Sequence, residues 1–144
     1  MARQILVPLD DSDQSTAALE HALDVYPDAD FVLLHVVNPE RWISAGDEEE
    51  GDVYYSSELE ETVKQAADDM LTETADSVRE MGVEVEAVQV LGQPATGILE
   101  YIDENDVDGV VMGSRGRTGL DRLLLGSVAE RVVRRSPVPV TVVH

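Results

Sequence analysis

Glycine, arginine and serine residues gather in one stretch of the chain, GSRGRTGLDRLLLGS, which runs from Gly113 to Ser127. Glycine allows backbone conformations closed to other residues and lets main-chain amides approach an anion closely. Arginine binds phosphate oxygens through its planar guanidinium group. A helix that starts after the last glycine would add free amides and the positive end of its dipole. The stretch therefore predicts a site for the phosphates of a nucleotide.

The distribution of charge sets this stretch apart from the rest of the chain. The 144 residues carry 30 acidic and 10 basic side chains, which is a formal net charge of -20. Residues 1–114 hold 28 of the acidic and four of the basic residues, whereas residues 115–144 hold six arginines and two acidic residues. The positively charged segment thus begins inside the glycine-rich stretch, where an anion would be held.

The acidic composition excludes several kinds of partner. So negative a surface repels nucleic acid and anionic membranes, and neither is expected as a general partner. Lys64 is the only lysine, and a carboxylate-rich surface almost without lysine is typical of a protein from a halophile, since abundant cations screen its self-repulsion; an ordinary acidic protein is the alternative. The first residues, MARQILVPLDD, fit neither a secretory signal nor a membrane span, so a cytoplasmic location is expected.

The hydrophobic pattern predicts one α/β domain over residues 1–144. Strands are expected near 4–9, 30–37, 83–90, 108–113 and 138–143. Helical spacing of apolar residues occurs at 17–23, 59–81, 98–102 and from about 128 to 135, with Gly82 expected to end the second of these helices. Residues 38–57 are expected to form a long surface loop, with a lid as the alternative. Strands that alternate with helices predict a Rossmann-like, five-stranded and mainly parallel sheet flanked by helices.

In open sheets of this kind, ligands bind beyond the carboxyl ends of the strands, where the strand order reverses. PLDDSDQS and GSRGRTG both follow predicted strands. Ser127 begins the sequence S-V-A-E, so its hydroxyl is expected to cap the last helix while Glu130 reaches back in a capping box. Asp10 fits a capping role in a polar turn and a direct ligand role equally well. His35, in an apolar strand, is interpreted as a hydrogen-bonded core residue rather than a catalyst.

The spacing Gly113, two residues, Gly116, nine residues, Gly126, Ser127 resembles the nucleotide-binding signature of the universal stress protein family, in its ATP-binding branch. ILVPLDDS, LLHVV, VMGSRG, LLGSVAERVV and PVPVTVV occur in the family's order, so the resemblance covers nearly the whole chain. It implies an adenine-nucleotide α-hydrolase-like fold with ATP and Mg²⁺, or Mn²⁺, as ligands.

The resemblance also implies roles for individual residues. Asp10 would lie near the nucleotide and its metal ion, and Val36 would lie beside the adenine. Gly126 and Ser127 would hold the terminal phosphates. The full nucleotide-binding set implied in this way is Pro8, Leu9, Asp10, Val36, Met112, Gly113, Arg115, Gly116, Arg117, Gly126 and Ser127.

The motifs of several enzyme classes are absent. Lys64 lies in a helical stretch, so the sequence has no Walker loop, and it has neither a G-x-S-x-G elbow nor a histidine pair with zinc-ligand spacing. Three functions remain open: an ATP-binding stress or regulatory protein, a slow ATPase or self-phosphorylating enzyme, and a dimeric stress protein that works without nucleotide.

The last predicted strand favours a homodimer. PVPVTVV, from Pro137 to Val143, carries no charge, and an uncharged apolar edge strand is an aggregation hazard unless something covers it. A second copy would cover that edge, and the N–H of Thr141 is expected to be one of its free donors. The alternative is that the valines only pack on the protein's own helices. The family resemblance also implies pairing through this strand across a two-fold axis.

Overall fold

The computed structural model describes residues 2–38, 57–114 and 125–144, with the side chains of residues 57–59 left aside. Most of the predicted loop over 38–57, and residues 115–124 of the glycine-rich stretch, lie outside this description. The elements along the chain are β1 (Gln4–Pro8), α1 (Asp13–Val25), β2 (Asp30–Val37), α3 (Ser57–Glu80), β3 (Val85–Leu91), α4 (Pro94–Glu104), β4 (Gly109–Gly113), α5 (Ser127–Arg135) and β5 (Val140–Val143).

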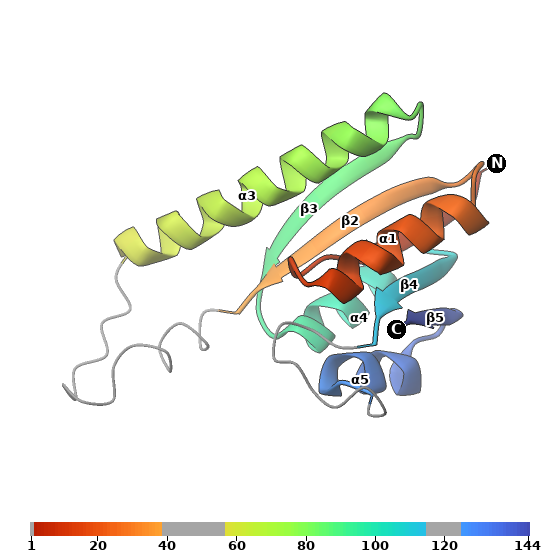
Figure 1. The fold of residues 1–144 in the computed structure, drawn as a ribbon. Helices are drawn as coiled ribbons and strands as arrows, with labels where there is room; N and C mark the ends of the chain where they lie inside the picture. Colours follow the sequence, from red (N-terminus) through yellow and green to blue (C-terminus); the bar gives the residue numbers. More distant parts are fainter. Residues whose placement is uncertain (1, 39–56, 115–124) are drawn as a thin grey trace.

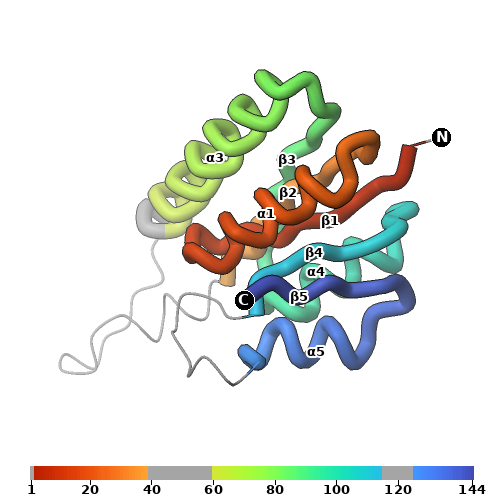
Figure 2. The backbone as a smooth tube through the Cα atoms, turned by 45° about the vertical axis from the view of Figure 1, so that its right-hand side comes forward, coloured from red at the N-terminus to blue at the C-terminus, as the bar shows by residue number. Residues whose placement is uncertain are grey.

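The described strands form one sheet in the order β3-β2-β1-β4-β5, and every neighbouring pair is parallel. Helices α1 and α3 cover one face of the sheet and α4 and α5 the other (Figures 1 and 2). The chain adds β2 and β3 on one side of β1 and then returns to add β4 and β5 on the other side. The strand order therefore reverses between β1 and β4, and the predicted α/β fold is confirmed.

Each face of the sheet has its own hydrophobic core, because successive strand residues point to opposite faces. Both faces are buried, which explains why the central strands are almost continuously apolar. The α1 and α3 side includes Ile5, Val7, Leu9, Phe31, Leu33 and Val111, and the α4 and α5 side includes Leu6, Val32, Leu34, Val110, Met112 and Val132.

The ends of several elements follow from local chemistry. The hydroxyl of Ser12 caps α1 by accepting the N–H of Ser15 at 3.1 Å. Gly82 has φ +82° after the end of α3, as predicted for a glycine that stops a helix. The last strand begins at Val140, two residues later than predicted, because the Ser136 hydroxyl bonds both main-chain groups of Val138 in a turn.

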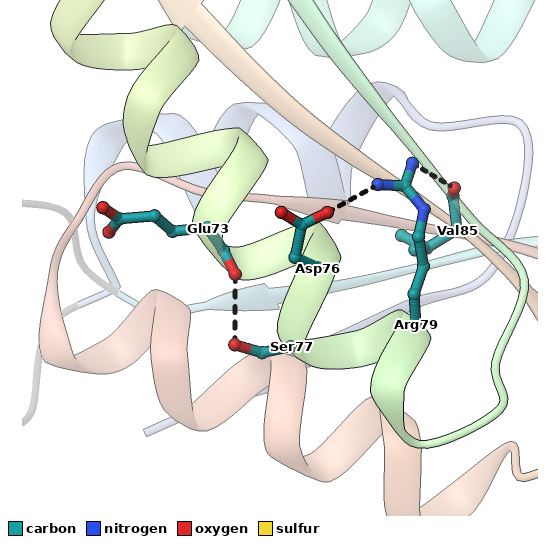
Figure 3. A network of polar contacts seen from close by, with 5 residues as sticks. All are labelled: Glu73, Asp76, Ser77, Arg79 and Val85. Carbon is teal, nitrogen blue, oxygen red and sulfur yellow. Dashed lines mark hydrogen bonds and ion pairs between the residues drawn. The ribbon is translucent and has the colours of Figure 1, made fainter.

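Helix α3 exposes a row of carboxylates that few cations balance. Arg79 donates to the carboxylate of Asp76 at 3.2 Å and to the carbonyl of Val85 at 3.1 Å, which joins the end of α3 to the start of β3 (Figure 3). The carboxylate of Glu73 points away from Arg79 (Figure 3). Exposed ion pairs of this kind contribute little stability. Because acidic side chains outnumber the basic ones on α3, most of the carboxylates repel one another. In the described part of the chain, no helix is both long and apolar enough to cross a membrane.

Gly113 ends β4 where α1 packs against the sheet. A Cβ atom at this position would lie 2.7 Å from the Cβ of Gln14 and 2.8 Å from its main-chain carbonyl carbon. Real Cβ atoms do not approach backbone this closely, and backbone cannot move aside cheaply. The absence of a side chain at Gly113 thus allows the first turn of α1 to lie directly on β4.

Gly113→Ala is expected to lower the free energy of unfolding by about 1 to 3 kcal/mol, because the added methyl group forces α1 away from β4. Gly109→Ala is the matched control at the other end of the strand, where a Cβ would meet Ile5 at 3.5 Å and the Pro139 carbonyl oxygen at 3.7 Å. Urea denaturation of both variants measures the difference. Equal losses from the two substitutions would contradict this packing role for Gly113.

The protein is expected to unfold at a lower temperature in dilute buffer than in molar salt, because its carboxylates repel over a longer distance when few ions screen them. Removing charge from the exposed Glu73 and Glu80 of α3, as Glu73→Gln with Glu80→Gln, should reduce this difference. Thermal melts followed by circular dichroism across a salt series test both statements. A melting temperature that does not change with salt would refute the expectation.

Candidate functional site

The candidate site lies at the carboxyl edge of the sheet, between β1 and β4. The turn after β1 leads into α1 and the segment after β4 leads into α5, so both helices begin at this edge. Ligands of open α/β sheets bind at such a reversal of strand order. Of the predicted set, the structure brings to this edge Pro8, Leu9, Asp10, Met112, Gly113, Gly126 and Ser127. Arg115, Gly116 and Arg117 lie outside the described residues.

The turn after β1 is organised by the side chain of Asp10. Its Oδ1 atom accepts the main-chain N–H of Ser12 at 3.0 Å and also the hydroxyl of Ser12. Between them, Asp11 adopts a left-handed conformation with φ +65°, which aspartate tolerates better than most residues. The N–H of Asp10 donates to the hydroxyl of Ser15 at 3.4 Å. Asp10 therefore shapes the turn, but it does not cap α1, because the N-cap is Ser12; its Oδ2 accepts no hydrogen bond within the described residues.

A metal ion at this edge would need ligands from the nucleotide itself. Among the described residues, no group of three or more histidine, cysteine, aspartate or glutamate side chains is placed to hold a metal. Mg²⁺ is usually bound by one or two carboxylates together with substrate phosphates and water. The single carboxylate of Asp10 fits that arrangement.

The start of α5 is held beside the end of β4 by main-chain hydrogen bonds. The N–H of Gly126 donates to the carbonyl of Ser114 at 2.7 Å, and the N–H of Ser114 donates to the carbonyl of Val143 at 2.8 Å. The residues on either side of segment 115–124 are therefore joined directly. Two parts of the predicted signature, Gly113 and the Gly126–Ser127 pair, meet at one point of the sheet edge.

The predicted capping box at Ser127 is wrong. Helix α5 has Gly126 as its N-cap, without a side-chain capping bond, and Ser127 is the first helical residue, one position too late to cap. Glu130 does not reach back either, since its carboxylate pairs with Arg134 one turn further along. The amides of residues 127–129 consequently have no hydrogen-bond acceptor within the described residues.

The two helix starts at this edge differ in charge. At α1 the Ser12 hydroxyl already accepts an amide, and Asp10, Asp11 and Asp13 place negative charge around the positive end of the helix dipole. At α5 the only acidic residue of the first turn is Glu130, and Arg134 pairs with it. An anionic group is therefore favoured at the start of α5 and disfavoured at the start of α1.

Val36 lies on β2 beyond the point where β1 has ended. The pairing of these strands stops at Pro8 and Leu34, and the N–H of Leu9 donates to the carbonyl of Leu34 at 2.8 Å. Main-chain groups of a strand alternate between its two neighbours, and even-numbered residues of β2 face β1, as Asp30 does. The N–H and carbonyl of Val36 are therefore directed toward the open end of β1. Its side chain packs instead against Gly97 of α4.

Leu9 and Met112 contribute backbone more than side chain to this edge. The side chain of Leu9 is buried in the core under α1 and α3, and that of Met112 in the core under α4 and α5. Only their main-chain atoms, with the half-buried ring of Pro8, are left to face a ligand.

Sequence reasoning missed the contributions of Ser12, Ser114 and the partner of His35. Ser12 stands two residues after an aspartate, which is a recognised local turn signal that was available. The buried Ser114 acts through its main chain, which leaves no signal in the sequence. The Nδ1 atom of His35 donates to the carbonyl of Leu9 at 2.6 Å, so the predicted hydrogen bond is confirmed, but the side chain is only half-buried and is not a core residue.

The Tyr101 hydroxyl on α4 lies away from this edge. Its pKa is raised mainly by burial and to a smaller extent by the negative charge of Glu86.

The chain has extensive similarity to known proteins. Universal stress protein MJ0531 of Methanocaldococcus jannaschii is 36% identical over 143 residues, which are 98% of this chain and 81% of that protein. The solved structure of MJ0577, a universal stress protein of the same organism, has a TM-score of 0.82 at 32% identity and covers 99% of this chain and 96% of its own. A universal stress protein solved in complex with cAMP has a TM-score of 0.70 at 25% identity, covering 99% and 97%.

The profile of the universal stress protein family matches residues 1–144. Together with the identity to MJ0531 over nearly the full chain, this match is decisive. The chain belongs to the universal stress protein family.

Proposed function

We propose that this protein binds ATP with Mg²⁺, or Mn²⁺, and that its nucleotide state changes its conformation or its partner surface. The observation that carries the proposal is the uncapped start of α5, held beside β4 by the bond from Gly126 to Ser114. Free amides and a positive dipole end at a reversal of strand order favour a phosphate group. The complex of a family member with cAMP supports an adenine nucleotide as the ligand class.

The phosphates would lie at Gly126 and Ser127, with the predicted contacts of Arg115, Gly116 and Arg117 added from outside the described residues. Asp10 would hold the metal ion through Oδ2, which accepts no hydrogen bond within the described residues, while the phosphates and water complete the coordination. In this arrangement the metal offsets part of the repulsion between the phosphates and the acidic turn after β1.

The base would lie at Val36. Its N–H and carbonyl offer one donor and one acceptor side by side, which suits the N1 acceptor and the 6-amino donor of adenine. Guanine in the same pose would present a donor to the N–H and an acceptor to the carbonyl. Unpaired polar groups at a buried edge cost affinity, so the site should discriminate between the two bases.

Magnesium-ATP is expected to bind at least about tenfold more tightly than magnesium-GTP, equivalent to about 1.4 kcal/mol or more. Isothermal calorimetry in molar salt, on protein freed of any co-purified nucleotide, measures both affinities. Equal affinities would refute base recognition at Val36. Heat from neither nucleotide would favour the dimeric protein that works without nucleotide.

A pair of variants at Ser127 tests the phosphate position within the same experiment. Ser127→Pro removes the hydroxyl and one main-chain donor at the first helical position, where proline is well tolerated. Ser127→Ala removes the hydroxyl alone and is the control. The expected outcome is a loss of ATP affinity of about tenfold for proline beyond that of alanine, with thermal stability in the absence of ligand preserved. Identical affinities of the two variants would remove the α5 amides from the site.

A homodimer through β5 is the second part of the proposal. Among the described strands β5 has a neighbour on one side only, namely β4. Val110 donates to the carbonyl of Pro139 and Ser114 to that of Val143, so odd-numbered residues of β5 face β4. The expectation that Thr141 offers a free edge donor is therefore wrong, and the open edge carries the N–H groups of Val140 and Val142.

The unmodified protein is expected to be a dimer at micromolar concentration, as measured by light scattering in molar salt. Val142→Pro removes an edge donor and should raise the dimer dissociation constant at least about tenfold, whereas Val142→Ala keeps that donor and should act less. A monomeric unmodified protein would refute the proposal whatever the variants do.

We also propose that the acidic surface is an adaptation to high salt. The exposed carboxylates of α3, for which Arg79 and Lys64 are the nearby cations, support this interpretation. The salt series described above tests it, because an ordinary acidic protein needs no molar salt to reach its full stability.

A further inference from the structure

The carbonyl of Leu9 is bonded to a side chain where the sheet would continue with a main-chain bond. From Asp30 to Leu34, the ladder between β1 and β2 alternates regularly, and its last bond runs from the N–H of Leu9 to the carbonyl of Leu34. The next bond in this series would run from the N–H of Val36 to the carbonyl of Leu9. That bond is absent, and the paired residues end at Pro8 and Leu34.

The imidazole of His35 takes its place. Nδ1 of His35 lies 2.6 Å from the carbonyl oxygen of Leu9, shorter than the usual 2.9 to 3.0 Å for a bond from nitrogen to oxygen. A carbonyl oxygen only accepts, so the proton of this bond is on Nδ1. The bond is partly buried, which strengthens it relative to one in water.

The position of His35 on β2 explains how this bond ends the ladder. Phe31 and Leu33 point into the core under α1 and α3, and alternation places His35 on the same face of the sheet. The Leu9 carbonyl is thus bonded to a donor on that face of the sheet and not to the N–H of Val36. The N–H of Val36 is then left without an acceptor in the described part of the chain.

We propose that His35 is a positioning residue that keeps the main-chain N–H of Val36 free for a ligand by occupying the carbonyl of Leu9. The use of that N–H to recognise adenine rests on the proposed function. The release of the N–H from the sheet is a property of the protein alone and can be measured without nucleotide.

Hydrogen exchange of the Val36 amide, followed by NMR on nucleotide-free protein, tests the release directly. In the unmodified protein this amide should exchange much faster than that of Leu34, which lies within the ladder. His35→Leu frees the Leu9 carbonyl, so Val36 should gain the ladder bond and exchange at least roughly tenfold more slowly. His35→Asn retains a donor near the position of Nδ1 and should keep exchange fast.

His21→Leu is the matched control, since His21 lies exposed on α1 and its loss should leave Val36 unchanged. A Val36 amide that is as protected as Leu34 in the unmodified protein would overturn the proposal. It would also be overturned if His35→Leu and His35→Asn gave the same exchange rate at Val36. Circular dichroism of each variant shows whether it has folded, and the asparagine variant keeps the test open if the leucine variant has not.

Nucleotide binding supplies the second readout. The unmodified protein and His35→Asn should prefer ATP to 1-deaza-ATP, which lacks the N1 acceptor, by on the order of tenfold, the size of one hydrogen bond. His35→Leu should lose this preference, because Val36 no longer offers its N–H. A preference that survives in His35→Leu would refute the role of His35 in recognition. If the unmodified protein binds no ATP, the proposed function fails while the exchange result still stands.

Discussion

The hydrogen bond from the N–H of Gly126 to the carbonyl of Ser114 joins the start of α5 to the end of β4, and the predicted phosphate side of the candidate site depends on it. It places the first turn of α5 at the end of β4, next to the point where the strand order reverses. The N–H of Ser114 donates in turn to the carbonyl of Val143, so consecutive hydrogen bonds link the helix start, the end of β4 and the edge strand β5. Under the proposed function, a change in this contact would shift the start of α5 and the edge strand β5 together, and so connect the nucleotide state with the proposed partner surface.

A strongly acidic protein has a particular difficulty in holding a polyanion. Its formal charge of -20 disfavours phosphate over most of the surface, and the turn after β1 and the start of α1 add Asp10, Asp11 and Asp13 close to the candidate site. Main-chain donors avoid this difficulty because their number does not depend on composition, and oriented amides at a helix start carry a partial positive charge. The start of α1 is acidic and the start of α5 has no side-chain cap, so the proposed phosphate position is at α5 and not at α1.

Main-chain groups also dominate the part of the site assigned to the base. Val36, Leu9 and Met112 direct their side chains into the two cores, and only backbone reaches the sheet edge. In such a site, specificity depends on which main-chain groups are left unpaired when the ladder ends. The last residue pair of the β1–β2 ladder is Pro8 and Leu34, and the carbonyl that would extend it, that of Leu9, is bonded to His35 instead. We propose that His35 in this way decides which main-chain group is left for a ligand.

The sequence alone determined the fold class and the succession of strands and helices along the chain, because alternating and helical periodicities and the helix-ending Gly82 are local signals. It also predicted the residues at the sheet edge through the family resemblance. Only the tertiary structure decided what individual residues do there. Gly113 was predicted as part of the nucleotide-binding set, and the structure shows a further reason for its lack of a side chain, namely the contact of α1 with β4. Ser127 matched a capping box that did not form. The helix starts one residue earlier than that box requires, because Gly126, which is bonded to Ser114, occupies the N-cap position. Thr141 faces β4 rather than the open edge, because pairing register is a relation between two strands distant in the chain. These outcomes depend on contacts between residues far apart in sequence, and local patterns carry no information about them.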